Sequence, residues 1–175
     1  AFGFFTFIAA TNVVSAMFVG IGLELPAAVL LAAAIAAWVV MGYSIPWLAV
    51  LSNPRRPILE AANGTWFIWV VASQSIAVVA AGIEPLYPEA RQWLAIIAVT
   101  TWSMGVMLYA MCGLLLLFRL IMYRLEPQQL DPPYWITMGA MAITVVAGAR
   151  IVEMDDAPMI DVTRALIAGL SVIFW

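Results

Sequence analysis

Long runs without any charged residue divide this chain, and they restrict its fold more than any other feature. The runs cover residues 1–23, 25–54, 61–83, 92–118 and 132–149, and a shorter run covers 165–175. A helix needs about 20 apolar residues to cross a bilayer core, so the first five runs are long enough, the fifth only just. Backbone groups in lipid must be paired within the segment, as they are in a helix. We therefore predict transmembrane helices at approximately 4–22, 27–51, 65–82, 92–123, 134–151 and 160–175.

The composition leads to the same class of protein. Hydrophobic residues make up 66% of the chain and charged residues only 10%, whereas soluble domains are about one quarter charged. No ten-residue alternation of apolar and polar residues, typical of barrel strands, is present in the sequence. The sequence therefore predicts an all-α integral membrane protein, with residues 1–175 forming one transmembrane domain.

The last uncharged run, residues 165–175, is too short to cross a membrane. As a helix it would extend about 16 Å, about half of a 30 Å hydrocarbon core. We therefore expect the chain to be a piece of a longer protein, truncated at both ends, with about six transmembrane helices of a larger bundle.

Several kinds of chemistry have no residues to support them. The chain has no histidine, and its one cysteine, Cys112, lies in an apolar run, so we expect no metal site and no cofactor. No serine lies in a recognisable nucleophile motif, and we expect no enzyme activity. The cores of the spans contain no Asp, Glu, Lys or Arg, although a proton-coupled pump usually needs such a group there. The small net charge of −3 gives no reason to expect a nucleic-acid partner.

Charges in the connections predict an orientation. Arginine near short loops marks the cytoplasmic side of a membrane protein. Arg55 and Arg56 follow the second span, and Arg119 and Arg124 flank the end of the fourth. The other connections are mainly acidic, although Arg91, Arg150 and Arg164 lie near them. We predict that the arginine-rich connections are cytoplasmic and that the acidic ones are external.

Polar side chains are concentrated in alternate spans. The second span is almost entirely apolar, and the fourth is mixed. The first, third and fifth spans carry hydroxyl and amide groups within the apolar run: Thr6, Thr11, Asn12, Ser15, Ser73, Gln74, Ser75, Thr137 and Thr144.

Two interpretations of these residues remain open. Thr11 and Ser15 share one face of a helix, as do Thr137, Met141, Thr144 and Gly148. Small and hydroxyl residues on one face let another helix pack closely, or they line a wet path. A hydroxyl can bond its own helix at position i−4, which favours packing, whereas an amide cannot satisfy all its hydrogen-bonding sites there.

Three segments carry a resemblance to a known family. "FGFFTFIAATNVVSAMF", "NGTWFIWVVASQSIAVVAAG" and "LEPQQLDPPYWITMGAMAITVVAGA" are similar to segments of the tellurite-resistance/dicarboxylate transporter family. This family includes fungal malate and sulfite transporters and plant slow-type anion channels. The resemblance implies ten helices in five hairpins, an inner ring of odd-numbered helices around a pore, and a homotrimer with one pore per subunit. It places the six predicted helices as the third to eighth.

The resemblance implies the function as well. Seven of the polar residues in the first, third and fifth spans become the expected pore lining: Thr11, Asn12, Ser15, Ser73, Gln74, Thr137 and Thr144. The family's gating phenylalanine belongs to the ninth helix, so Phe2, Phe4, Phe5 and Phe7 should not take that role. We expect an anion channel or transporter for C4-dicarboxylates such as malate, or for inorganic oxyanions, in a bilayer expected to be a bacterial plasma membrane. The alternatives are an ion-coupled exporter of sulfite or tellurite-related species and a membrane scaffold that transports nothing.

Overall fold

All regular structure in the described residues is helical. The computed structural model describes residues 2–51, 59, 62–123, 132–155 and 157–175. The long helices are α1 (Phe5–Gly20), α2 (Glu24–Leu51), α4 (Phe67–Ile83), α5 (Arg91–Met122), α6 (Ile136–Val152) and α7 (Pro158–Phe174). Short 3₁₀ turns adjoin them: η1 (Phe2–Phe4), η2 (Gly64–Trp66), η3 (Glu84–Leu86), η4 (Pro88–Ala90) and η6 (Pro132–Trp135).

Five segments of the described chain are long and apolar enough to cross a membrane. They are Phe2–Gly20, Glu24–Leu48, Gly64–Leu86, Pro88–Met122 and Pro132–Val152. Each of them is a helix together with any 3₁₀ turn that adjoins it, so its backbone groups are largely paired within the segment, as lipid requires. The predicted all-helical integral membrane fold is therefore confirmed.

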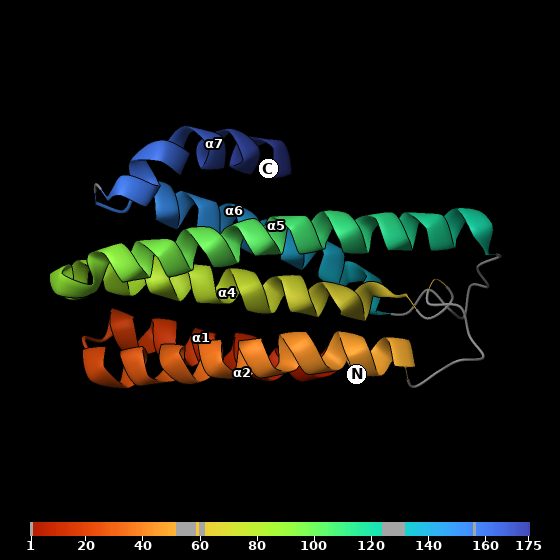
Figure 1. Ribbon diagram of the computed structural model, residues 1–175, viewed down its shortest axis with the longest axis horizontal. Coiled ribbons are helices and arrows are strands. Elements are labelled where there is room, and N and C mark those ends of the chain that lie inside the picture. Colours follow the sequence, from red (N-terminus) through yellow and green to blue (C-terminus); the bar gives the residue numbers. More distant parts are fainter. Residues whose placement is uncertain (1, 52–58, 60–61, 124–131, 156) are drawn as a thin grey trace.

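Consecutive helices lie side by side, and α4 occupies the centre of the bundle. Figure 1 shows α1 beside α2, α4 beside α5, and α6 beside α7, with the α4–α5 pair between the other two. α4 contacts α1, α2, α5 and α6. Of its most apolar stretch, 67% is buried, against 17–28% for the other four candidate spans. Neighbouring helices therefore surround α4 on most of its sides.

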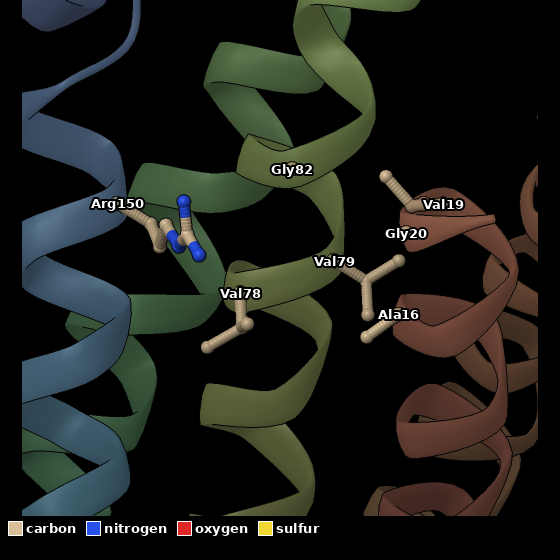
Figure 2. Close-up of a pocket in the computed structure, with 7 residues that line it drawn as sticks. All are labelled: Ala16, Val19, Gly20, Val78, Val79, Gly82 and Arg150. Atoms are coloured by element: carbon tan, nitrogen blue, oxygen red, sulfur yellow. The ribbon is translucent and has the colours of Figure 1, made fainter. Parts of the chain in front are cut away.

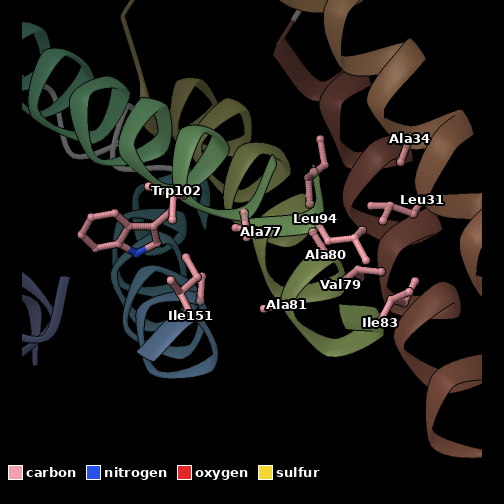
Figure 3. Close-up of a cluster of buried hydrophobic side chains, with 14 of the residues drawn as sticks. Leu31, Ala34, Ala77, Val79, Ala80, Ala81, Ile83, Leu94, Trp102 and Ile151 are labelled. Atoms are coloured by element: carbon pink, nitrogen blue, oxygen red, sulfur yellow. The ribbon is translucent and has the colours of Figure 1, made fainter. Parts of the chain in front are cut away.

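Small residues allow the neighbours of α4 to approach it closely. Ala72, Ala77, Ala80 and Ala81 are all buried, and Figure 3 shows three of these alanines among larger side chains from α2, α5 and α6. Apolar helices gain little hydrophobic energy from leaving lipid, so their association depends on such close van der Waals packing.

An arginine joins two connections at one end of the bundle. Nε of Arg91 lies 2.5 Å from Oε1 of Glu84, and Nη2 of Arg91 lies 2.8 Å from Oδ2 of Asp155. Glu84 is only 1% exposed, whereas Asp155 is 64% exposed. Arg91 thus links the turn between α4 and α5 to the segment between α6 and α7.

The opposite end of α5 carries Arg119, whose guanidinium donates a hydrogen bond to the carbonyl of Ala62. Arg55, Arg56 and Arg124, which also support the predicted orientation, lie outside the described residues. The orientation therefore stays a prediction.

Candidate functional site

A cavity of about 200 Å³ lies between α1, α4 and α6, which belong to three different hairpins. Figure 2 shows side chains from all three helices converging on it, with Arg150 reaching from α6 toward the last turns of α4. The lining residues are Ala16, Val19, Gly20, Val78, Val79, Gly82 and Arg150.

The lining residues identify which face of each helix is turned toward the cavity. Residues spaced by three and four lie on one face of a helix, so each face can be followed away from the cavity along its own helix. The three faces, which we call the cavity stripes, are Ala9, Val13, Ala16 and Gly20 on α1; Val71, Ser75, Val78 and Gly82 on α4; and Gly139, Ile143, Val146 and Arg150 on α6.

Exposure supports this assignment of faces. On α1 and α6 every cavity-stripe residue is exposed or half-buried, although both helices have fully buried faces elsewhere. On α4, most of which is buried, Val71, Val78 and Gly82 are half-buried. The cavity stripes are therefore the partly open sides of these three helices. They are built from Ala, Gly, Val and Ile, with one hydroxyl at Ser75 and one charge at Arg150.

Ser75 forms a polar contact between two of these helices. Its Oγ accepts a hydrogen bond of 2.9 Å from Nδ2 of Asn12 on α1 and donates one of 2.8 Å to the carbonyl of Ala72. Asn12 is 1% exposed and its Oδ1 has no hydrogen-bond partner. A primary amide has two N–H donors, so Asn12 keeps a second donor beyond its bond to Ser75. This pair lies one to two turns deeper in the bundle than the cavity lining of Val78 and Gly82.

Ser73 and Gln74 point to other helices. Ser73 Oγ accepts a hydrogen bond of 2.9 Å from Nε1 of Trp38 on α2 and donates one of 3.0 Å to the carbonyl of Trp69. Gln74 is fully buried, and its Nε2 donates to the carbonyl of Trp102 on α5 at 3.2 Å. The three adjacent polar residues of α4 thus face α2, α5 and α1 respectively.

The predicted residues of α1 and α6 also bond within the bundle. Ser15 Oγ donates to the carbonyl of Ala27 on α2 at 2.8 Å, and Thr11 bonds the carbonyl of Phe7 in its own helix. Thr137 and Thr144 bond the carbonyls of Tyr134 and Ala140.

The stripe that contains Thr144 faces α5 and α7. Nε1 of Trp102 on α5 donates to the carbonyl of Thr144 at 3.0 Å. A Cβ on Gly148 would lie 2.1 Å from Oγ of Ser171 on α7, so this stripe lets α7 pack closely against α6. For Thr144 the geometry favours helix packing, one of the two interpretations that the spacing left open.

The seven predicted pore-lining residues therefore occupy different environments. Asn12, Ser15, Ser73, Gln74 and Thr144 are buried, whereas Thr11 and Thr137 are half-buried. The structure brings Asn12 to Ser75, a residue absent from the predicted set. Ser75 shares one helical face with Val71, Val78 and Gly82, because these residues are spaced by four, three and four. This spacing identifies Ser75 as the polar residue on the cavity side only once the packing partners of Ser73 and Gln74 are known.

Among the described residues, no group of three or more His, Cys, Asp or Glu side chains is arranged to hold a metal ion.

Comparison with known proteins places these helices in a family. Residues 2–175 match the sequence profile of the SLAC1 family, described as voltage-dependent anion channel. Two uncharacterized membrane proteins of Mycobacterium tuberculosis, from strains CDC 1551 / Oshkosh and H37Rv, are each 60% identical to the chain over 68 residues. That match covers 39% of this chain and 34% of each relative, so the chain spans about a third of the curated relatives it matches. No solved structure matches the chain. Because the family profile covers almost every residue, the chain belongs to the voltage-dependent anion channel family.

Proposed function

We propose that this chain forms part of a pathway for small anions across the membrane and that the three cavity stripes are part of its wall. The observation that carries this proposal is the cavity between α1, α4 and α6. These helices are the first members of three successive pairs, and their second members, α2, α5 and α7, pack against their other sides. This is the arrangement expected of an inner and an outer ring.

The chemistry of the stripes suits weak and transient binding. A conducting path must bind an ion well enough to admit it and weakly enough to release it. The second amide N–H of Asn12, which Ser75 holds in place, offers a neutral hydrogen-bond donor at the middle of the bundle, while Ala, Gly and Val leave the path narrow and apolar. Under this proposal Asn12 contacts the anion, and the other buried members of the predicted set hold the ring together.

The proposal also names the class of transported anion and the assembly of the protein. C4-dicarboxylates such as malate and inorganic oxyanions are the proposed substrates, and a homotrimer in a bacterial plasma membrane is the proposed assembly. An ion-coupled exporter of sulfite or tellurite-related species is the alternative transport mechanism. Currents across a planar bilayer would favour a channel, whereas flux that stops when an ion gradient is removed would favour the coupled exporter.

The reactivity of introduced cysteines tests whether the cavity stripes line the proposed anion pathway. In the full-length protein with Cys112→Ser, we expect Ser75→Cys and Val78→Cys to react with a small hydrophilic thiol reagent, and anion flux into liposomes to fall after reaction. Val29→Cys and Val40→Cys on α2 serve as matched controls because both valines are well exposed on an apolar helix, at 58% and 64%, and should face lipid. Equal reactivity of the two sets would contradict the proposed path.

Gln74→Cys and Thr144→Cys extend the same experiment to the residues predicted from the sequence. Their positions against α5 make them slower to react than Val78→Cys if the cavity stripes form the wall. Faster reaction at Gln74 and Thr144 would instead place the path on the opposite faces of α4 and α6.

A further inference from the structure

Arg150 occupies a position between two neighbouring cavities. It lines the cavity between α1, α4 and α6, together with Gly82. The same two residues also line a second cavity of about 170 Å³, whose other lining residues are Ala81, Glu84, Pro85, Glu153 and Met154. Arg150 and Gly82 therefore lie at the boundary between the two cavities.

Arg150 is also the described arginine least engaged by the protein. Arg91 lies within ion-pair distance of two carboxylates, and Arg119 and Arg164 donate to backbone carbonyls. The ion pair of Arg150 is with Glu153, three residues along the same helix, at 3.7 Å, and these side chains are 60% and 70% exposed. A charge-assisted hydrogen bond between these groups would be about 2.7–2.9 Å long, so Glu153 holds Arg150 loosely.

Glu84 is the second acidic residue that lines the second cavity, and its carboxylate is paired with Arg91 at 2.5 Å. Its negative charge is thus partly offset by Arg91, which it shares with Asp155. Among the described residues that line the two cavities, Glu153 is the carboxylate that pairs with Arg150 and can compete with an anion.

We propose that Arg150 is an anion-binding site at the mouth of the cavity and that Glu153 is a built-in competitor for it. The site takes carboxylates and oxyanions, because a guanidinium offers paired N–H donors that match two oxygens of one anion. Binding exchanges the loose contact with Glu153 for a closer contact with the anion. The role of the site as an entrance rests on the proposed anion pathway, whereas binding itself does not.

Four variants of the full-length protein separate these roles, with sodium malate and sodium nitrate as probes. Arg150→Gln should raise the half-saturating anion concentration by about twofold to fivefold, the effect expected of losing an ion pair at a side chain that is 60% exposed. Arg150→Lys, which keeps the charge but loses the paired donors, should lie between Arg150→Gln and the parent. Glu153→Gln should lower the half-saturating concentration, because the competitor is gone. Glu89→Gln is the matched control, since Glu89 is an exposed acid in the turn between α4 and α5 and does not line either cavity.

Two measurements distinguish failure of the site from failure of the pathway. Flux into liposomes reports transport, and the rise in melting temperature of the purified protein with added anion reports binding. If the parent transports anions and Arg150→Gln matches it in both measurements, the Arg150 site is wrong and the pathway stands. If the parent shows no flux but its anion-dependent stabilisation disappears in Arg150→Gln, the site stands and the pathway is wrong. No anion dependence in either measurement would overturn both.

Discussion

At the residue scale, Gln74 shows how a single amide can hold two helices together. It is fully buried, and its Nε2 bonds the carbonyl of Trp102 on α5. A Cβ on Gly105 would lie 2.4 Å from that nitrogen. Glycine at this position therefore makes room for the amide, and α4 and α5 approach each other around it.

This contact leads to a prediction for Gln74→Leu. The change removes an interhelical hydrogen bond worth about 0.6 kcal/mol on average in membrane proteins. We expect a lower melting temperature and unchanged anion flux per folded protein, because Gln74 faces α5 rather than the cavity. Thermal unfolding of the full-length protein and flux into liposomes measure the two effects.

Ser75→Ala is the matched comparison, one residue further along α4. Its Oγ lies on the cavity stripe and holds Asn12 through a neutral hydrogen bond, so we expect flux to fall by up to about tenfold as Asn12 loses its position. If Gln74→Leu loses flux but keeps its stability, Gln74 lines the anion path, as the sequence predicted, and does not serve mainly to hold α4 against α5.

The direction of each polar side chain could not be read from the sequence. Successive residues of a helix point about 100° apart because there are 3.6 residues per turn, so Ser73, Gln74 and Ser75 necessarily face different neighbours. The uncharged run predicted that these residues lie in a membrane helix. Which of them faces the cavity depends on where Trp38, Trp102 and Asn12 lie, and those positions are set by packing between distant segments.

At the element scale, the uncharged runs predicted helical segments, and five of the six predicted spans overlap segments of the described chain that are long and apolar enough to cross a membrane. The span predicted at 65–82 corresponds to α4 (Phe67–Ile83), and that at 92–123 to α5 (Arg91–Met122). The 3₁₀ turns at Gly64–Trp66 and Pro132–Trp135 were not predicted. These two turns contact each other, and a Cβ on Gly64 would lie within 2 Å of the carbonyl oxygen of Pro133. Such a close approach of distant segments has no signal in either segment alone.

The ionic link between hairpins gives a prediction at the same scale. Arg91→Gln leaves the buried carboxylate of Glu84 without its cation. Breaking a fully buried pair costs about 3–5 kcal/mol, and since Arg91 is one-third exposed, solvent screening should reduce this to about 1–3 kcal/mol. Thermal or denaturant unfolding in detergent measures the loss.

Two further variants check the cause. Asp155→Asn should cost less than about 1 kcal/mol, because that carboxylate is well exposed. Adding Glu84→Gln to Arg91→Gln should recover most of the stability, since no buried charge then remains. Failure of the double variant to recover would mean that Arg91 acts through packing rather than charge.

At the scale of the whole molecule, exposed apolar side chains can contact either lipid or another helix, and the sequence does not distinguish between these two kinds of contact. Val40, Met107 and Val162 are 64%, 74% and 84% exposed, and apolar side chains suit contact with lipid as well as with another helix. The sequence could therefore predict an integral membrane bundle but not which outer faces meet lipid and which meet further helices or subunits. Small residues are more informative, because Gly and Ala on the cavity stripes leave space that a larger side chain would fill.

Charge at the two ends of the bundle gives the last prediction, the orientation in the membrane. The C-terminal ends of α1, α4 and α6 meet at the side that carries Glu84, Glu89 and Asp155, and in the sequence the arginine-rich connections follow α2 and α5, which end at the opposite side. Short arginine-rich loops stay in the cytoplasm. In a Cys112→Ser background, cysteines at Glu89 and Pro158 should therefore react with an impermeant thiol reagent added to intact cells. Cysteines at Tyr123 and Pro132 should react only after the cells are opened, and the reverse pattern would place the mouth at Arg150 on the cytoplasmic side.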